Sequence, residues 1–530
     1  MTMKRFSIYS VFLVLFVMAG CTDKFDEINT DPTQSSESTW DPNFFLPNAQ
    51  ISYINLGYGN IIYQSLFMQV LASTFSYYGN GDKYVNTQNS TSYQGSIFNT
   101  TYNVGRLLAE MMRLSKGKDQ YSNLYNVGRI LQVMNFQQGT DTYGDIPYSE
   151  AFKVKDGVAT PKYDTQQSIY AAMLPELESA INALDATKLK PTGDLFYAGD
   201  IAKWKKFGYS LMLRVAMRLT KIDPATAKTW AEKAAAGGTF ASIDDNAKII
   251  ADASNANSAI YNVYQVTDDF RELRFSKTLI DNLKSAGDPR LSAVAEVPAA
   301  GAAANANQTL VGDNSAAVQL GLPNGFDLIG GATDITKSAG YPGATGTGND
   351  VAPLGKYSRP RISVYLKRGG TLEVLTYPGT ELLLAEAKAR GWNIPGTAAD
   401  HYKNGVVGGM TTLTQLDASA AISAATATAF ADAHPLDVSS LDASLKMINT
   451  QYWIVTGTTF DFMENWSNWR RSGYPVLTPV NYPSNVTNAT IPRRMIYLST
   501  EIITNGTSYT DAVGRLSGGD KLTGKVWWDK

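Results

Sequence analysis

Apolar residues along much of the chain recur at intervals of three and four, the spacing that places side chains on one face of a helix. The clearest run consists of Trp204, Phe207, Leu211, Val215 and Leu219. We expect this helix to end before Asp223-Pro224, where Asp223 caps the next helix and Pro224 occupies its first turn. That second helix should end at Gly237-Gly238, because glycine readily adopts the left-handed conformation that closes a helix. The pattern predicts a helix–turn–helix pair.

A similar pair is predicted downstream. It begins at Pro378 and ends at Gly391, and Thr397 with Asp400 then resembles a capping box for the following helix. Another helix should begin near Asp164 and contain Pro175, which either kinks it or interrupts it. Strand signals are weak and limited to short runs such as Ile362 to Leu366. We therefore predict a mainly all-α fold of stacked hairpins similar to tetratricopeptide repeats, with few short strands.

Two long segments lack this periodicity. Residues 295–350 are rich in Ala, Gly and Asn, and residues 411–435 are rich in Ala, Thr and Ser, so we expect both to be surface loop insertions. The organisation predicted is a signal peptide over residues 1–20, a polar tether over 21–38 and a single helical domain over 39–530.

The N-terminal segment predicts a lipid anchor. Lys4 and Arg5 precede an apolar run from Phe6 to Met18, which is too short to span a bilayer and fits a signal peptide. Ala19-Gly20-Cys21 follows and resembles the lipobox of bacterial lipoproteins, in which the cysteine is acylated; Met18 stands where leucine is usual. The alternative is an ordinary cleaved signal with an incidental cysteine. No later segment reaches 18 uninterrupted apolar residues, so we expect no transmembrane helix.

Composition narrows the function classes. The net charge of −2 argues against nucleic-acid binding, which depends on neutralising phosphates. The single cysteine excludes a disulfide framework and a multi-cysteine zinc site. The chain has 29 Tyr and 20 Phe, and tyrosine suits surfaces that need an apolar face beside a polar tip.

Signals for catalysis are few. Neither His401 nor His434 belongs to a metal-binding or catalytic motif, and no nucleophile elbow or phosphate-binding glycine loop is present, so we predict no enzyme, no cofactor and no metal. Asp141, Asp145 and Glu150 form the best carboxylate cluster. We favour a structural role for it over ligand contact or glycoside hydrolysis, because Asp side chains commonly bond nearby backbone N–H groups in tight loops.

Two tryptophans raise a similar question. Trp466 and Trp469 lie three residues apart beside Arg470 and could form a stacking platform for a ligand. Phe462 precedes Trp466 by four residues on the same predicted helix, which favours a buried packing stripe.

Five segments in order carry a family resemblance. They are Cys21–Asn29 with Asp31-Pro32, Thr140–Ala151, Trp204–Phe207 leading to Leu213–Arg218, Glu381–Ala387, and Trp466–Pro475. Together they resemble the SusD/RagB family of nutrient-binding outer-membrane lipoproteins of Bacteroidota-type bacteria, in particular its second SusD-like lineage. The resemblance implies one fold of stacked helix pairs topped by an irregular, loop-rich subdomain. It also implies a SusC-like TonB-dependent transporter as partner, and a glycan or peptide as cargo.

The residues suggest where that cargo binds. A sugar ring packs on aromatic faces while its hydroxyls bond amides and carboxylates. The segment from Phe75 to Tyr93 offers this mixture, and its glycines predict a loop; the family's glycan-contacting loops lie in a comparable region and in the mid-chain insertion. The predicted ligand residues are Tyr77, Tyr78, Asn80, Asp82, Tyr84 and Tyr93, followed by Phe326 and Tyr341.

The leading hypothesis is a lipid-anchored outer-membrane protein on the cell surface. It would bind glycans and deliver them to a transporter. The alternatives are a surface glycosidase that uses Asp141 and Asp145, a peptide-binding protein, or a purely structural lid on the transporter. The sequence does not identify the sugar, its linkage or the copy number in the transporter complex.

Overall fold

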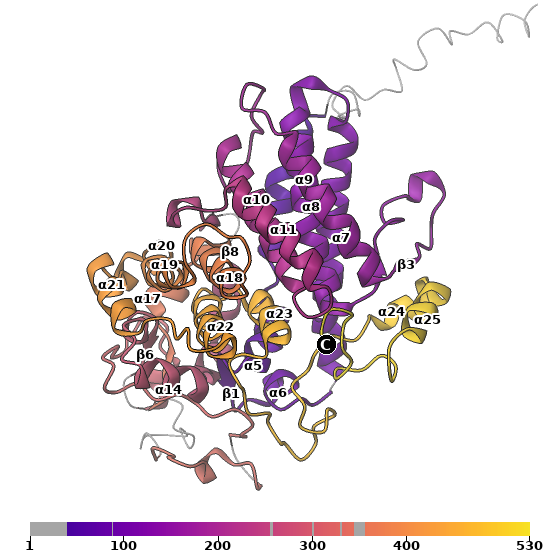
Figure 1. The fold of residues 1–530 in the computed structure, drawn as a ribbon. Helices are drawn as coiled ribbons and strands as arrows, with labels where there is room; N and C mark the ends of the chain where they lie inside the picture. The colour runs from indigo at the N-terminus through magenta and orange to yellow at the C-terminus, as the bar shows by residue number, and fades with distance from the viewer. Residues whose placement is uncertain (1–39, 87, 255–257, 299–300, 329–330, 344–355) are drawn as a thin grey trace, which may run out of the picture. The chain divides into compact units, whose positions relative to one another are not determined.

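A computed structural model describes residues 40–86, 88–254, 258–298, 301–328, 331–343 and 356–530 (Figure 1). Two units separate by their internal contacts, Met1–Pro42 and Asn43–Lys530, and the account below concerns the second. The predicted signal peptide, the tether and Cys21 lie outside the described residues.

The unit is mainly α-helical. Its principal helices are α3 (Phe45–Ile54), α7 (Gln88–Ser115), α8 (Ser122–Tyr143), α9 (Gln166–Asn182), α10 (Ile201–Arg218), α11 (Pro224–Gly237), α18 (Tyr377–Ala389), α19 (Ala398–Thr411), α22 (Leu441–Thr458) and α23 (Phe462–Ser472). Each helix from α7 to α11 packs on the next one along the chain. Helices α10 and α11 then contact α18, which packs against α19 and α22 (Figure 1). The predicted fold of stacked helix pairs is confirmed.

The predicted hairpin of α10 and α11 forms as its sequence indicates. Asp200 caps α10 by accepting hydrogen bonds from two backbone N–H groups, and Trp204 and Phe207 on its apolar face are fully buried. Asp223 caps α11 by accepting from Thr226 N at 3.1 Å, and Gly238 follows the helix with φ +97°. Polar caps and glycine stops therefore set these boundaries.

Two other predicted helices differ in detail. Helix α9 is capped by Thr165 and continues through Pro175 to Asn182. Helix α18 is capped by Thr376, so it begins one residue before Pro378. Thr397 caps α19 as predicted, accepting from Asp400 N at 3.0 Å.

The chain between α11 and α18 forms an irregular subdomain. It contains both strands of two of the four two-stranded antiparallel ladders in the described residues, and one strand of a third. The ladders are β1 (Leu71–Ser73) with β5 (Leu273–Phe275), β2 (Ile146–Pro147) with β3 (Tyr163–Asp164), β4 (Ala247–Ile250) with β8 (Thr371–Leu375), and β6 (Ala295–Glu296) with β7 (Arg359–Pro360). Only β2 and β3 pair entirely outside it.

Short helices complete the unit. They are α4 (Gly57–Ile62), α5 (Gln64–Phe67), α6 (Gly79–Asp82), α12 (Ala259–Tyr264), α13 (Thr267–Glu272), α14 (Lys277–Ser285), α15 (Arg290–Val294), α16 (Ala302–Ala306), α17 (Ile362–Tyr365), α20 (Leu413–Leu416), α21 (Ala424–Ala433), α24 (Ser499–Thr504) and α25 (Gly506–Gly514). The described part of residues 297–343 contains α16, a 3₁₀ turn over Ile335–Lys337 and otherwise irregular backbone.

Two expectations about secondary structure are wrong. Residues 411–435 hold α20 and α21 where the composition suggests a loop, because Ser423 caps α21 and the helix buries Ala427 and Phe430 against α19. Ile362–Tyr365 is the helical turn α17 and not a strand. A run of small or β-branched residues specifies little by itself, and packing decides its conformation.

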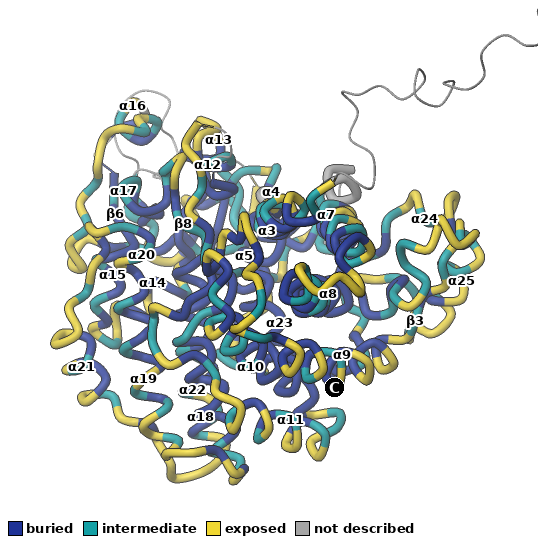
Figure 2. Tube along the Cα trace, turned by 90° about the horizontal axis from the view of Figure 1, so that it is seen from above, coloured by how far each residue is buried: buried dark blue, intermediate teal, exposed yellow. Residues whose placement is uncertain are grey.

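One large hydrophobic core extends through the unit, and Figure 2 shows buried segments along α10 and α23 with exposed ones at α24 and α25. A small second cluster comprises Ala72, Leu322, Ile335 and Tyr357. Because Ala72 belongs to β1, this cluster fastens the mid-chain insertion to the strand that precedes the predicted ligand segment.

Candidate functional site

Most of the predicted ligand segment folds inward. Tyr78, Asn80, Asp82 and Tyr84 are each at most 2% exposed, so the prediction that these four contact a ligand is not supported. The segment forms a 3₁₀ turn and α6 in place of the expected loop. Its glycines serve close packing: a Cβ on Gly81 would lie 2.0 Å from the backbone oxygen of Ile62.

Tyr77 and Tyr93 are half-buried and belong to an aromatic cluster. We call Tyr58, Phe75, Tyr77 and Tyr93 the tyrosine cluster. The ring centroids of Tyr77 and Tyr93 lie 5.7 Å apart, and those of Tyr58 and Tyr93 lie 5.8 Å apart. The hydroxyls of Tyr58 and buried Tyr78 both donate to Asp269, which anchors the cluster to α13. Because their rings are partly exposed, Tyr77 and Tyr93 remain candidates for ligand contact.

Buried Asp82 positions the mid-chain insertion. Its carboxylate accepts a hydrogen bond from Asn324 Nδ2 at 2.6 Å and another from Gly325 N at 2.7 Å. Burial raises the pKa of Asp82, opposed by neighbouring Lys83. Tyr84 holds the segment after α23 in a similar way, since its hydroxyl accepts a hydrogen bond from Val480 N at 3.4 Å. Asp82 and Tyr84 therefore hold in place two segments that form walls of a groove, although neither side chain lines that groove.

That groove, which we call the insertion groove, has a volume of about 540 Å³. It lies where α14, the mid-chain insertion and the segment after α23 meet. Its lining residues are Gln69, Lys277, Thr278, Asp281, Pro323, Asn324, Gly325, Phe326, Ala332, Thr333, Thr478, Pro479, Val480 and Asn481. Phe326 supplies an aromatic ring that is half-buried against the small second cluster.

Hydrogen bonds brace the groove from within. Gln69 Nε2 donates to Thr478 O at 2.5 Å, and Thr278 Oγ1 donates to Gln69 Oε1 at 2.8 Å. Gly325 has φ +89°, and a Cβ there would meet Val480 at 2.5 Å, so a side chain is excluded by conformation and by space. The walls are thus largely preformed, as is usual for small-molecule sites.

The charges of the groove nearly balance. The charged side chains that line the groove are Lys277 and Asp281, which pair with each other on α14. Lys83, which does not line it, lies with its Nζ 3.6 Å from Asp327 and 4.0 Å from Asp82. The lining therefore carries one cationic and one anionic side chain, and they are paired. An uncharged ligand with hydroxyl and amide groups suits this arrangement better than a polyanion.

Part of this groove was predicted from the sequence. Phe326 lines it, whereas half-buried Tyr341 does not. Gln69, Asn481 and the segment 478–481 were missed, because they come from distant parts of the chain and carry no local motif. The proline at 479 beside exposed polar residues is the one signal that marks this segment as a surface loop.

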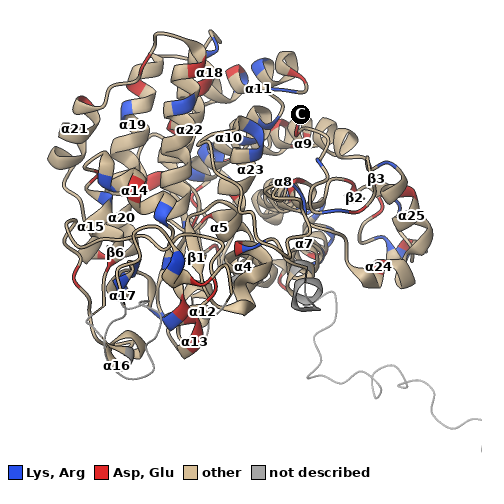
Figure 3. Ribbon diagram, turned by 90° about the horizontal axis from the view of Figure 1, so that it is seen from below, with Lys and Arg blue, Asp and Glu red and all other residues tan. Residues whose placement is uncertain are grey.

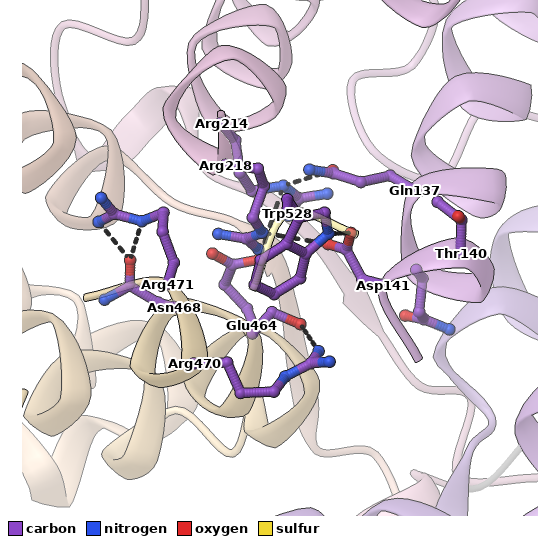
Figure 4. A network of polar contacts seen from close by, with 12 residues as sticks. Gln137, Thr140, Asp141, Arg214, Arg218, Glu464, Asn468, Arg470, Arg471 and Trp528 are labelled. Atoms are coloured by element: carbon purple, nitrogen blue, oxygen red, sulfur yellow. Dashed lines mark hydrogen bonds and ion pairs between the residues drawn. The ribbon is translucent and has the colours of Figure 1, made fainter. Parts of the chain in front are cut away.

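The acidic cluster proposed for hydrolysis is structural. Asp141 is 2% exposed at the end of α8 and accepts from Arg218 Nε at 3.1 Å and from Trp528 Nε1 at 2.8 Å (Figure 4). It also accepts from the Tyr170 hydroxyl. Asp145 accepts from Gln166 N at 2.9 Å. The glycosidase alternative fails, because a saturated and buried carboxylate cannot reach a sugar.

Asp141 belongs to a wider buried network. Arg218 also pairs with Glu464, and Arg471 pairs with Glu386 at 2.6 and 2.7 Å. Figure 3 shows basic residues gathered along α10 and α23, the two helices that carry these arginines. The network joins the helices of the stack to one another.

The remaining sequence candidates are also structural. Trp466 is fully buried and Trp469 is 8% exposed, so the packing stripe is confirmed over the stacking platform. Arg470 lies over the Trp466 ring at 3.7 Å from its centroid. His401 Nδ1 lies 2.7 Å from Glu381, which fits a structural histidine.

The described part of the chain has neither a membrane-spanning helix nor a metal-binding cluster of side chains. None of the helices there is both long and apolar enough to cross a membrane. No group of three or more His, Cys, Asp or Glu side chains that could hold a metal ion occurs in the same part of the chain.

Comparisons with known proteins agree with this architecture. A solved chitin-binding protein shares 31% identity over 92% of this chain and 100% of its own, with a TM-score of 0.78. A Bacteroidetes AC2a SusD-like structure shares 24% over 93% and 100%, with a TM-score of 0.76. A chitin-binding SusD homolog from Flavobacterium johnsoniae shares 24% over 92% and 98%, with a TM-score of 0.72. No curated protein matches the chain.

A family model described as "Starch-binding associating with outer membrane", SusD-like, matches residues 32–498. This confirms the resemblance found in the sequence and the prediction of a protein that binds and does not catalyse. The chain belongs to this SusD-like family of carbohydrate-binding proteins associated with the outer membrane.

Proposed function

We propose that the protein binds a neutral glycan in the insertion groove. One observation carries the proposal: a preformed hollow of about 540 Å³ combines the half-buried ring of Phe326 with exposed Asn481, which makes no hydrogen bond to another described residue. The ring offers a stacking face and the amide offers both a donor and an acceptor for sugar hydroxyls. Family membership supports carbohydrate as the ligand class.

The first candidate ligand is an oligomer of β-linked N-acetylglucosamine. The solved protein that is 31% identical to this chain is described as chitin-binding. Such a ligand is uncharged, which agrees with the pairing of Lys277 and Asp281 in the groove. Its acetamido groups match an amide such as Asn481 in hydrogen-bonding capacity. Starch oligosaccharides are the second candidate, from the description of the family.

Calorimetric titration of the folded unit with chito-oligosaccharides, malto-oligosaccharides and oligouronates tests the proposal. Phe326→Ala should weaken binding of the neutral ligand about tenfold, which corresponds to about 1.4 kcal/mol. Phe44→Ala, which removes a 71% exposed phenylalanine elsewhere, is the matched control and should bind normally.

Each other outcome has a defined meaning. Loss of binding in Tyr77→Ala with Phe326→Ala unaffected would move the site to the tyrosine cluster. Binding of peptides in place of sugars would favour the peptide alternative. Binding of none of these ligands, together with capture of a β-barrel partner, would favour a structural lid.

We also propose that the protein is anchored by acylated Cys21 and passes its glycan to a SusC-like TonB-dependent transporter. The lipobox-like Ala19-Gly20-Cys21 and the family's association with the outer membrane support this placement. Acylation by more than one chain would hold the protein stably at the membrane. Cys21→Ser should move the protein from the membrane fraction to the soluble fraction, and copurification of a transporter with the wild type tests the partnership.

A further inference from the structure

A second groove lies at the start of α9 and shares no lining residue with the insertion groove. We call it the α9 groove, and its volume is about 710 Å³. It is lined by the turn after α8, the first turn of α9, and parts of the segments 515–517 and 523–530. Sites for small molecules usually enclose roughly 300–1,000 Å³, so the α9 groove can hold a short oligosaccharide.

One aromatic ring is held in this groove by a segment that is otherwise anchored. Val526, Trp528 and Asp529 are each at most 3% exposed. Trp527 lies between them, is half-buried and lines the groove, and its ring centroid lies 6.3 Å from that of Tyr170. The indole N–H of Trp527 makes no hydrogen bond to a described residue. Trp527 therefore offers the groove a fixed aromatic surface and an unused donor.

Both acidic side chains that line the groove are already paired. Asp145 accepts from Gln166 N at 2.9 Å through one oxygen and from Arg515 Nε at 2.5 Å through the other. Asp529 pairs with Arg493 through both of its carboxylate oxygens. The groove thus presents no uncompensated acidic side chain to a ligand.

Two lysines of the groove have no such partner. Lys525 and Lys530 are exposed, and neither pairs with an acidic side chain among the described residues. Gln167, in the first turn of α9, is exposed as well, and its side-chain amide bonds no described residue. The insertion groove differs, because Lys277, the lysine that lines it, is paired with Asp281. The α9 groove therefore suits a ligand that carries both negative charge and hydroxyl groups.

We propose that the α9 groove binds a hexuronate unit of an acidic oligosaccharide. Trp527 stacks on the C–H face of the sugar ring, and Gln167 bonds its hydroxyls. The ammonium groups of Lys525 and Lys530 pair with its carboxylate. Inorganic phosphate and a polyglutamate peptide can also pair with lysines, but neither has a flat apolar face to cover Trp527. This site is separate from the proposed neutral-glycan site and does not rest on it.

Titration calorimetry of the protein with trimers of galacturonate, glucuronate and mannuronate tests the proposal. At least one trimer should bind, and its methyl ester, which keeps the rings but has no charge, should bind about tenfold more weakly. Trp527→Ala should weaken binding of the acid about tenfold, and Trp527→Phe, which keeps a ring, should lose less. Lys525→Gln should weaken it about two- to fivefold, and added salt should weaken binding to the wild type. Lys116→Gln, which removes an exposed lysine elsewhere, is the matched control and should bind normally.

Variants of the two grooves separate this proposal from the proposed function. Phe326→Ala should leave binding of the hexuronate trimer unchanged, and Trp527→Ala should leave binding of chito-oligosaccharides unchanged. Loss of hexuronate binding in Phe326→Ala, with Trp527→Ala unaffected, would overturn the proposal and assign the acid to the insertion groove.

Three other results would also overturn the proposal. They are no binding of any of the three trimers, equal binding of the methyl ester, and binding of phosphate or polyglutamate as tight as that of hexuronate and insensitive to Trp527→Ala. The last result would indicate a general anion site. The outcome with chito-oligosaccharides does not bear on the α9 groove.

Discussion

The buried ionic network and the insertion groove both contain polar and aromatic side chains. In the network these side chains bond to one another, whereas in the groove some remain available to a ligand. In the network, Asp141 accepts three hydrogen bonds and Arg471 pairs with Glu386 through two nitrogens. In the groove, Asn481 is exposed and engages none of the described residues, and Phe326 keeps part of its ring accessible. The polar groups of the network named here bond to one another, whereas the groove offers a polar group that a ligand can bond.

This difference shows why residue type alone misassigns function. Aspartate, arginine and tryptophan are frequent at binding sites, but here their most conspicuous combinations hold helices together. A buried charge pair contributes little net stability compared with an apolar pair, yet removing one partner leaves the other uncompensated. Unused bonding capacity, and not the richness of polar residues, marks the candidate site.

The largest effect should come from breaking the network. Arg471→Met leaves the Glu386 carboxylate buried without its main partner and should lower the free energy of unfolding by about 3–5 kcal/mol. Denaturant unfolding measures the change. Arg113→Met, which breaks the half-exposed pair with Glu110, is the control and should cost about 0.5 kcal/mol or less. Comparable losses of unfolding free energy in both variants would contradict the contrast between the buried and the half-exposed ion pair.

Acid should weaken the same network. Although burial opposes it, Arg471 lowers the pKa of Glu386 to about 2, below the ordinary value of 4.5. A carboxylate with a depressed folded pKa contributes stability that is present above pH 4.5 and lost as pH falls toward 2, here on the order of 3 kcal/mol. Unfolding measured between pH 5 and pH 2.5 should show a smaller pH dependence in Glu386→Gln than in the wild type. An identical pH dependence of unfolding in the two proteins would refute the role of Glu386 in the acid sensitivity of the network.

An intermediate effect is expected from the support of the groove. Asp82→Ala leaves Asn324 Nδ2 and Gly325 N without their acceptor, which should cost about 1–3 kcal/mol of stability and weaken glycan binding. Asp82→Asn retains one acceptor oxygen and should recover part of both losses. Glycan affinity that is unchanged in Asp82→Ala would separate the insertion from the binding site.

The smallest effect should come from the groove surface. Asn481→Ala removes an exposed amide, so stability should be unchanged while glycan affinity falls about two- to fivefold, the loss expected for one hydrogen bond. Titration calorimetry and thermal unfolding of the same preparation measure both quantities. A stability loss without an affinity change would mean that Asn481 is structural.

The sequence by itself determined the hairpin of α10 and α11, the caps of α11 and α19, and the family. Asp223, Thr397 and the apolar face around Trp204 act within a few residues, so local order is enough to specify them. The sequence also indicated that Trp466 packs in the core, since its spacing from Phe462 is helical.

Only the tertiary structure decided which candidates face inward and what lines the groove. From the sequence around it, Gly81 is predicted to lie in a loop, but in the structure it permits close packing against Ile62. Gln69, Phe326 and Asn481 are separated by more than 150 residues from one another and share no pattern in the sequence. Their proximity comes from long-range packing, in which Asp82 bonds the insertion and Tyr84 the segment after α23. Such contacts depend on the whole chain being folded, and local periodicity does not encode them.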